Sequence, residues 1–426
     1  MNLWIETGNL ARAQALFGVP PLERLRRSVG NIARAEALLG APPLERLRRS
    51  VGHLDSGDIV TLSGPRAAEA SWPGARIDAD SSPLGTRLRR ALTDAPGPLV
   101  ALDGANVTDP RLIRFLSSSS PCVASRGEGA RRATALSLDR SLATAIPPEA
   151  TSLQAVADAL IASGRIAPLD ERTFPAYMNK LRRSLPWWQY VVEDRATRKQ
   201  LERQLFWDNY KGSTDLLTRW VYPPLVWPLV QACTALRIHP NVLTSISVVL
   251  AFAAVPLWAG GHWLAGFVCA YAMSILDSVD GKVARLTFTD SKIGNVLDHG
   301  LDQIHPPFWY FAWAWGLGAR TADDPLYMTA VWLIVFYIAD RLVLGVAKRR
   351  IGFTLHAATR MDGLVRAVIA RRNITMTIMA IALLAGAGHV GLILVTVWQG
   401  LTFAWHAART VWLGFLSARP APPKPR

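Results

Sequence analysis

The sequence predicts an α-helical polytopic membrane domain of six transmembrane helices, preceded by a small cytoplasmic α/β domain. Half of the 426 residues are hydrophobic and the mean hydropathy is +0.18, which is high for a soluble protein. The apolar residues gather in long runs from about Trp220 onward, whereas the preceding part resembles ordinary soluble sequence. Because roughly 20 apolar residues cross the hydrocarbon core of a bilayer, these runs are long enough to span it.

The chain is strongly basic, with a formal net charge of +15 and a pI of about 10.3. Such a balance suits binding to nucleic acid or contact with an anionic membrane surface. The sequence contains no zinc-finger spacing, RNP-type motif or basic-aromatic ladder, so we expect no nucleic-acid partner. The three cysteines, Cys122, Cys233 and Cys269, form no CxxC pair and predict neither a disulfide framework nor a zinc site.

A tandem repeat with a period of 22 residues lies near the start of the chain, in copies at 11–32 and 33–54. Each copy predicts two short helices broken at a Gly-x-Pro-Pro sequence, and two copies are too few for a stable solenoid. We therefore expect residues 1–56 to form a helical tandem-repeat appendage. A basic amphipathic contact with the membrane surface is the alternative.

Residues 57–210 alternate between strand-like and helix-like segments, which predicts the α/β domain. The expected strands are 58–63 and 98–102, and the expected helices are 84–92, 111–116 and 153–161. No Gly-rich phosphate loop is present. A juxtamembrane stretch at 211–241 follows, and its prolines and tryptophans favour an interfacial helix over a membrane span.

Six apolar segments predict a membrane domain at 242–418, followed by a disordered tail at 419–426. The predicted spans are 242–260, 263–286, 294–318, 326–347, 374–390 and 392–416. Lys and Arg are abundant in every second loop, whereas the loops at 260–262, 319–325 and 388–391 contain only Arg320. Positive residues mark cytoplasmic loops. We therefore expect an integral protein of a bacterial inner (cytoplasmic) membrane, with the N-terminus and the C-terminus in the cytoplasm.

An acidic motif at 277–302 joins the second and third predicted spans and reads DSVDGKVARLTFTDSKIGNVLDHGLD. Asp277 and Asp280 are three residues apart and share one helix face. Asp298 and Asp302 are four residues apart and share a face of the next helix. Because the link between the helices is short, they can run antiparallel and bring all four carboxylates together at the cytoplasmic mouth.

Such a cluster needs a cation, because ionised carboxylates in or near a membrane are costly. A ligand set of oxygens alone suits Mg²⁺ or Mn²⁺ better than zinc or copper, and the metal would also neutralise a pyrophosphate. Gly281, Ala284 and Gly294 are small residues that leave room for the backbone to approach a bulky ligand. Arg285 can pair with a phosphate or with a carboxylate.

The acidic motif resembles the signature of the CDP-alcohol phosphatidyltransferase family, D-x2-D-G-x2-A-R-x8-G-x3-D-x3-D, and matches all eight fixed positions. The resemblance covers about residues 215–415. It extends to Pro240-Asn241, although His239 stands where Thr is common in the family.

The resemblance implies a role for each matching residue. Asp277, Asp280 and Asp298 would be metal ligands. Asp302 would be the base that deprotonates the acceptor hydroxyl and would also touch a metal, so that Asp298 and Asp302 are the implied catalytic residues. The implied nucleotide and pyrophosphate site of the donor consists of Asn241, Gly281, Ala284, Arg285 and Gly294.

The reaction that the resemblance implies is transfer of a phosphoalcohol group from a CDP-alcohol donor to an acceptor alcohol, with release of CMP, in phospholipid or related polar-lipid biosynthesis. The donor would be of the CDP-diacylglycerol or CDP-inositol type. The active site would face the cytoplasm, membrane lipids would surround it, and a homodimer is expected. Which alcohol accepts the group stays open.

The order of domains also resembles family members that carry a nucleotidyltransferase domain ahead of the membrane part. The stretch PLVALDGANVTD at 98–109 is similar to the metal-binding edge of that fold, but the expected Gly-rich, Arg-containing loop is missing. The implied domain at 57–210 is therefore a degenerate and inactive one.

Charged residues in and beside the later spans are candidates for the acceptor site. Arg341 lies next to Asp340 inside the fourth predicted span, and Arg371 and Arg372 precede the fifth. An acceptor that carries a phosphate would bind such arginines. Two other interpretations stay open: Asp340 and Arg341 pair with other buried groups, and Arg371 and Arg372 serve only topology.

Two other functions would use the same carboxylates. A divalent-cation transporter would place them on an ion pathway, but they cluster at one membrane face and no inverted repeat is visible. A non-catalytic membrane scaffold would have kept the motif without using it.

Overall fold

The structure is a computed structural model of the chain. It describes residues 1–7, 59–65, 67, 74–104, 106–178, 181, 183–191, 195–287, 289 and 292–416, and of residues 130, 195, 292–299, 301 and 302 it describes the backbone alone. The 22-residue repeat and the predicted tail at 419–426 lie outside the described residues. Chain contacts divide the protein into two compact units. Unit 1 is Met1–Ala176, Leu185–Asp208 and Arg285–Lys292, and unit 2 is Tyr177–Ser184, Asn209–Ala284 and Ile293–Arg426.

Unit 1 is built on a seven-stranded mixed sheet with the strand order β3-β2-β1-β4-β7-β6-β8. The strands are β1 (Asn2–Glu6), β2 (Ile59–Ser63), β3 (Arg76–Asp78), β4 (Leu99–Asp103), β6 (Cys122–Arg126), β7 (Ala133–Leu138) and β8 (Ala167–Pro168). Strands β3, β2, β1 and β4 are parallel, and β7 runs antiparallel to both of its neighbours. The predicted strands at 58–63 and 98–102 correspond to β2 and β4.

Strand β1 corrects the expected boundary of the N-terminal appendage at 1–56. Its sequence NLWIE lies in the middle of the sheet, where Leu3 pairs with Val60 on one side and with Val100 on the other. A central parallel strand is covered on both faces, so it is an unbroken apolar run without the polar alternation that marks a half-exposed strand. Five residues beside a chain end therefore carried too little pattern to be recognised.

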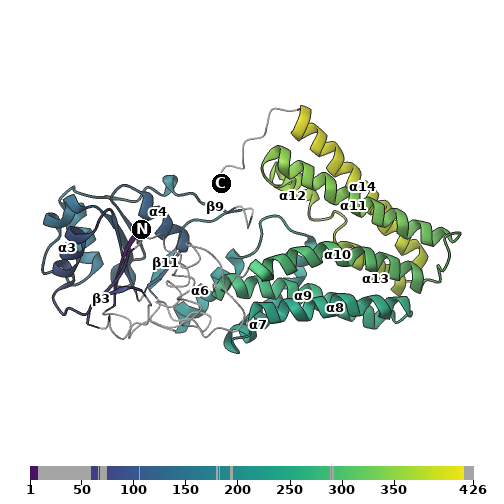
Figure 1. Ribbon diagram of the computed structural model, residues 1–426, viewed down its shortest axis with the longest axis horizontal. Helices are drawn as coiled ribbons and strands as arrows, with labels where there is room; N and C mark the ends of the chain where they lie inside the picture. The colour runs from purple at the N-terminus through teal and green to yellow at the C-terminus, as the bar shows by residue number, and fades with distance from the viewer. Residues whose placement is uncertain are drawn as a thin grey trace. The chain divides into compact units, whose positions relative to one another are not determined.

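Helices cover both faces of the sheet (Figure 1). They are α3 (Leu84–Asp94), α4 (Pro110–Ser118) and α5 (Leu153–Ala162), and the unit also contains α6 (Arg195–Asp208). Side chains alternate along β1, so Leu3 and Ile5 pack in the cluster that contains α4, while Trp4 packs in the cluster that contains α3 and α5. Short elements complete the unit: β5 (Asn106–Thr108) paired with β11 (Gln189–Val191), and the 3₁₀ turns η3 (Gly129–Arg131), η4 (Arg140–Ala145) and η5 (Glu171–Thr173).

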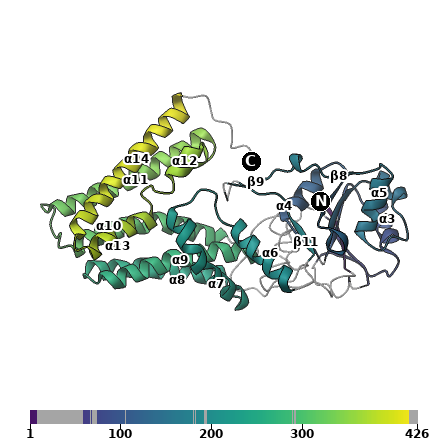
Figure 2. The same cartoon turned by 180° about the vertical axis from the view of Figure 1, so that it is seen from behind.

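Unit 2 is helical apart from a short hairpin of β9 (Tyr177–Met178) and β10 (Arg183–Ser184). Its long helices are α7 (Tyr222–Ala235), α8 (Pro240–Ala259), α9 (Trp263–Thr287), α10 (Lys292–Gly316), α11 (Pro325–Ile351), α13 (Arg372–Leu384) and α14 (Gly388–Val411). The shorter ones are η6 (Leu217–Val221), η7 (Leu355–Ala357), α12 (Arg360–Val365) and η8 (Trp412–Leu416). In both views α8, α9 and α10 lie side by side, and so do α11 and α14 (Figures 1 and 2).

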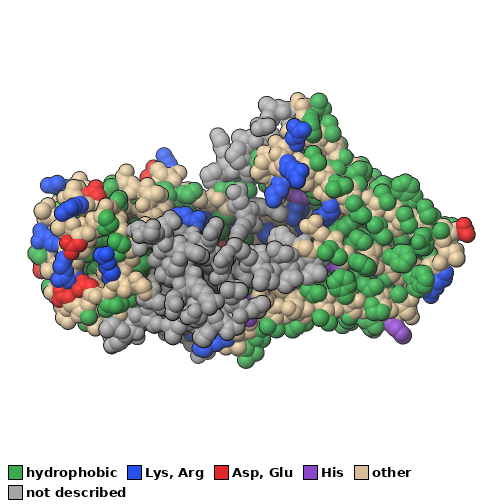
Figure 3. All heavy atoms as spheres, viewed as in Figure 1, with side chains coloured by type: hydrophobic (Ala, Val, Ile, Leu, Met, Phe, Trp, Pro, Cys, Tyr) green, Lys and Arg blue, Asp and Glu red, His purple; other side chains and the backbone are tan. Residues whose placement is uncertain are grey.

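Four helices of the described part are long and apolar enough to cross a membrane: Pro240–Ala259, Trp263–Thr287, Pro325–Ile351 and Gly388–Leu416. Hydrophobic side chains dominate the visible face of unit 2 (Figure 3). The exposed apolar residues of this unit include Val249, Leu264 and Leu342. Exposed apolar residues over several long helices are what a lipid-facing surface requires. Unit 2 is therefore a helical domain of the membrane type.

The predicted loop at 388–391 is wrong, because the break between the last two helices lies at residues 385–387. Gly386 has a positive φ of 70° there and ends α13 in the conformation that glycine favours. Gly388 and Gly391 instead lie in α14. A Cβ on Gly391 would come within 2.5 Å of the Ala382 Cβ, so this glycine allows close helix packing and not a turn.

Candidate active site

The residues of the acidic motif lie on two consecutive helices. Asp277, Asp280, Gly281, Ala284 and Arg285 occupy the second half of α9. The other motif residues, Gly294, Asp298 and Asp302, lie in the first half of α10, and their side chains are outside the described part.

Asp280 is a buried carboxylate held by a neighbouring helix. Its side chain is only 4% exposed, and the hydroxyl of Thr244 on α8 donates a hydrogen bond of 2.6 Å to Asp280 Oδ2. Thr244 lies one helical turn after Asn241, whose backbone N–H is capped by the ring of His239 at 3.2 Å. Asn241, which was predicted to contact the CDP-alcohol donor, therefore lies at the same end of α8 as Thr244, the residue that holds Asp280.

Asp277 forms an ion pair with Arg372, the first residue of α13. Arg372 Nη2 lies 2.6 Å from Asp277 Oδ2 and also donates to Ser274 Oγ at 3.3 Å. Ser274 is one turn before Asp277 on α9, so the guanidinium contacts two successive positions on one face of that helix. The structure thus brings one predicted acceptor residue to the first carboxylate of the acidic motif.

Lys282 lies within the acidic motif, at a position that the family signature leaves open, and was not predicted as a site residue from the sequence. It is buried, its Nζ lies 3.8 Å from the ring centroid of Tyr210, and it donates to the Ser278 carbonyl at 3.3 Å. A lysine inside a largely apolar helix was the available signal, because such a charge needs a partner. Its aromatic partner is distant in sequence and could not be identified from the motif.

Asp215 is a second buried carboxylate in unit 2, in the segment that precedes η6. Burial by itself would raise the pKa of Asp215. Hydrogen bonds from the Thr218 backbone and the Asn373 amide, together with the charge of Arg371, lower that pKa below its usual value. Asp215 is therefore ionised at neutral pH, and it lies against the start of α13, where Arg371 and Arg372 are located.

Arg341 and its neighbour Asp340 are placed differently. Asp340 on α11 pairs with His406 on α14 through Oδ1 and Nδ1 at 2.5 Å, and both side chains are buried. Arg341 lies over the ring of Tyr337, with its Cζ 4.9 Å from the centroid. The Asp340–His406 pair agrees with the interpretation in which Asp340 pairs with another buried group.

The donor atoms available near the motif are those that a hard cation prefers. Two carboxylates come from α9, one of them buried, and the chemistry of oxygen ligands fits Mg²⁺ or Mn²⁺. Among the side chains that the structure describes, no three His, Cys, Asp or Glu residues converge on one point. The other two carboxylates of the acidic motif, Asp298 and Asp302, belong to α10.

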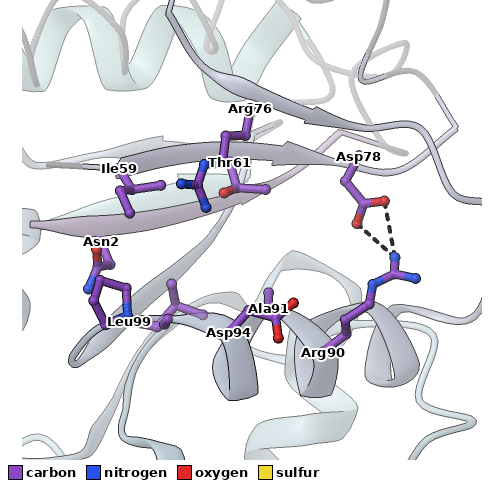
Figure 4. A pocket seen from close by; sticks show the side chains of 11 residues that line it. Asn2, Ile59, Thr61, Arg76, Asp78, Arg90, Ala91, Asp94 and Leu99 are labelled. Carbon is purple, nitrogen blue, oxygen red and sulfur yellow. Dashed lines mark hydrogen bonds and ion pairs between the residues drawn. The ribbon is translucent and has the colours of Figure 1, made fainter.

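Unit 1 contains a small pocket of about 190 Å³ between the sheet and α3 (Figure 4). It extends from the amino ends of β1, β2 and β4, where Asn2, Ile59 and Leu99 lie, to Asp78, the last residue of β3. Arg90 from α3 faces Asp78 from β3 across it, at 3.1 Å. Ligands of open α/β sheets bind at the carboxyl ends of the strands, and of the residues that line this pocket only Asp78 comes from such an end, where Arg90 already pairs with it.

The carboxyl ends of β1 and β2 are filled by protein side chains. Arg87 forms a buried ion pair with Glu6 at 2.8 Å and donates to Ser63 Oγ at 2.8 Å. Gly64, with a φ of 126°, fits against them because a Cβ there would lie 2.8 Å from the Glu6 carboxylate. These side chains pack against one another at the carboxyl ends of β1 and β2.

Comparison with known proteins identifies the helical part of the chain. A family model described as CDP-alcohol phosphatidyltransferase matches residues 237–412. Archaetidylinositol phosphate synthase from Aeropyrum pernix is 42% identical over 65 residues, which are 15% of this chain and 34% of that protein. Cholinephosphotransferase 1 from Homo sapiens is 29% identical over 142 residues, which are 32% of each chain.

A solved structure of similar type is the Mycobacterium tuberculosis phosphatidylinositol phosphate synthase with CDP-DAG bound. It is 20% identical, with a TM-score of 0.37, over 45% of this chain and 96% of that one. This chain spans between 32% and 48% of the length of the curated relatives that it matches. The matched residues contain helices α8 to α14 and the whole acidic motif. The protein thus carries a domain of the CDP-alcohol phosphatidyltransferase family at residues 237–412.

Proposed function

We propose that this protein transfers a phosphoalcohol group from a CDP-alcohol donor to an acceptor alcohol and releases CMP, with Mg²⁺ or Mn²⁺ as cofactor. The observation that carries the proposal is the acidic motif, which matches the family signature at all eight fixed positions within the matched domain. The buried Asp280, held by Thr244, and the paired Asp277 support it, because metal-dependent phosphoryl transfer needs carboxylates held in place.

In this proposal Asp277, Asp280, Asp298 and Asp302 hold the metal. When bound, the metal would neutralise the diphosphate of the donor and the charge that develops during transfer. Asp302 accepts the proton of the acceptor hydroxyl, which then attacks the phosphorus distal to cytidine, and CMP leaves with the electrons of the broken P–O bond. The donor lies against Asn241, Gly281, Ala284, Arg285 and Gly294.

The acceptor would bind on the arginine side of the same site. Arg371 and Arg372 at the start of α13 are the candidates with support from geometry, because Arg372 contacts the acidic motif. Arg341 has less support from geometry, since its guanidinium lies over the ring of Tyr337. The names of the relatives suggest testing inositol phosphate first, with CDP-diacylglycerol as the donor.

We further propose six membrane spans, formed by the four candidate spans together with α10 and α13. The active site and both termini would be cytoplasmic, in a bacterial inner membrane, with α7 lying at the interface and the chain forming a homodimer. Unit 1 would be an inactive nucleotidyltransferase-like domain. The apolar outer surface of unit 2 and the basic residues that end α11 support this arrangement.

The test is CMP release by the purified full-length protein from CDP-diacylglycerol, with a panel of acceptors that includes inositol phosphate and glycerol phosphate. We expect release only with Mg²⁺ or Mn²⁺, and loss of release in Asp298→Asn and Asp302→Asn. Asp323→Asn is the matched control, because it makes the same chemical change in an exposed loop. Variants of the motif that turn over like wild type would refute the proposal. Metal uptake into vesicles without CMP release would favour the transporter.

A further inference from the structure

Asn373 lies at the centre of a buried hydrogen-bond network that the sequence of the acidic motif does not predict. It is the second residue of α13 and follows Arg372, which pairs with Asp277. Asn373 and three of its partners, Asp215, Tyr222 and Ser274, are all buried. Networks of this kind are rigid when every member is satisfied, because each bond is stronger in a low dielectric.

The two ends of the Asn373 amide meet partners of opposite character. Its Oδ1 accepts from Ser274 Oγ at 2.6 Å and lies 3.2 Å from the Tyr222 hydroxyl. Its Nδ2 donates to Asp215 Oδ1 and to Thr218 Oγ1, both at 3.1 Å. Asparagine suits this position because its amide accepts hydrogen bonds through the oxygen and donates two through the nitrogen.

The direction of these bonds determines how Ser274 meets Arg372. Ser274 has one hydroxyl proton and uses it on Asn373, so its oxygen is left to accept from Arg372 Nη2 at 3.3 Å and from Tyr222 at 3.0 Å. The same Nη2 donates to Asp277 Oδ2 at 2.6 Å. A continuous chain of bonds therefore runs from Asp215 through Asn373, Ser274 and Arg372 to Asp277.

We propose that Asn373 is a positioning residue for the transfer reaction. It ties the segment before η6 and the start of α13 to the turn of α9 before Asp277, and thereby holds Arg372 against that carboxylate. The inference rests on the proposed function, in which Asp277 binds metal. A shift of Asp277 or Arg372 by a fraction of an ångström would slow transfer, since positioning supplies most of the catalysis.

A charge-swap experiment tests the network in the full-length protein. Asn373→Asp places a second carboxylate against Asp215, and we expect kcat for CMP release, per folded molecule, to fall by about tenfold or more. Asp215→Asn alone keeps an acceptor for Thr218 and should change kcat by less than about threefold. The double variant restores one amide and one carboxylate at this contact, and should recover kcat to within about threefold of wild type.

Two further variants separate positioning from general stability. Thr377→Val removes another hydrogen bond between α13 and α9, the one that joins Thr377 and Tyr271 at 3.0 Å, together with the bond from Thr377 Oγ1 to the Asn373 backbone carbonyl at 2.8 Å. It leaves the Asn373 amide and its partners in place and should leave kcat unchanged. Ser274→Ala removes the hydroxyl that links Asn373 to Arg372, together with its bond from Tyr222 at 3.0 Å. It should lower kcat about fivefold, because Arg372 loses one of its hydrogen-bond acceptors. This variant tests the proposal even if Asn373→Asp does not fold.

The outcomes are distinct. Wild-type kcat in Asn373→Asp or in Ser274→Ala, or a double variant no better than Asn373→Asp, would overturn the role of Asn373 while leaving the proposed function intact. If Thr377→Val lowered kcat as much as Asn373→Asp does, the effect would reflect general packing of α13 against α9, and the positioning role of Asn373 would also be overturned. Absence of CMP release from the wild-type protein would refute the proposed function itself, and the positioning role with it.

Discussion

Thr244 stabilises the buried carboxylate of the acidic motif through one hydrogen bond. Its hydroxyl donates to the buried Asp280 at 2.6 Å, and a hydrogen bond to a charged group contributes about 1.5–3 kcal/mol. Thr244→Val leaves that carboxylate with one donor fewer, so we expect CMP release to fall by about tenfold, whereas Thr244→Ser should retain most of it. Equal activity in the two variants would show that the contact does not position Asp280.

Cys122 provides a prediction about pH in unit 1. Burial raises the pKa of its thiol to about 11. Because the thiolate is the reactive form, alkylation at pH 8 should be roughly two-hundredfold slower than for a free cysteine with a pKa of about 8.5, and should accelerate about tenfold per pH unit up to pH 11. Mass spectrometry of the intact protein after iodoacetamide treatment measures this. A rate that levels off near pH 9 would contradict it.

The carboxylates of the site could be read from the sequence, but their partners could not. Asp277 and Asp280 are recognisable because their spacing places them on one helix face, which is a local property. Arg372 is 95 residues away from Asp277 along the chain, and Asn373 is 99 residues away from Ser274. Such pairs depend on how the helices pack, so no pattern within a short window reveals them.

At the scale of helices, the Asp340–His406 contact joins α11 to α14. Both side chains are buried, and removing one partner of a buried pair costs about 3–5 kcal/mol because the other is left uncompensated. We expect His406→Ala to lower the melting temperature in detergent clearly more than Asp340→Asn, which removes the charge but keeps a polar partner. Tryptophan fluorescence on heating measures both. A smaller loss in His406→Ala would contradict the pairing.

Close packing of α13 against α14 makes a second prediction at this scale. A Cβ on Gly391 would lie 2.5 Å from the Ala382 Cβ, whereas one on Gly345 in α11 would meet nothing within 4 Å. Gly391→Ala should therefore lower the melting temperature and Gly345→Ala should not, because overpacking costs about 1–3 kcal/mol. Equal melting temperatures for the two variants would show that the helices can separate at no cost.

The helix break predicted at 388–391, which the structure has at residues 385–387, illustrates what periodicity can decide. Hydropathy located both apolar segments, since it sums over many residues. It could not tell a glycine that ends a helix, as Gly386 does at a φ of 70°, from one that lets two helices approach, as Gly391 does. That distinction depends on the neighbouring helix.

For the whole molecule, the distribution of basic residues predicts the orientation in the membrane. In a chain whose three cysteines are replaced by serine, Ala322→Cys should react with a membrane-impermeant maleimide in intact cells, and Met361→Cys should react only after lysis. Both positions are exposed on the protein surface. Labelling of Met361→Cys from outside would reverse the topology.

The two-part character of the chain followed from composition alone, because apolar runs after Trp220 contrast with the sequence before it. The sheet of unit 1 was only partly foreseen. Its central strand β1 lies at the start of the chain and is separated by more than fifty residues from β2, its neighbour in the sheet. Neighbouring strands usually follow one another more closely.

The most direct test of the central claim is the position of manganese in a crystal of the full-length protein grown with Mn²⁺ and a CDP-alcohol. The account predicts that the strongest anomalous peak at the manganese edge lies between α9 and α10, about 2.1 Å from oxygens of Asp277, Asp280, Asp298 or Asp302 and beside the diphosphate. A peak elsewhere, or carboxylates directed into separate surroundings, would contradict it.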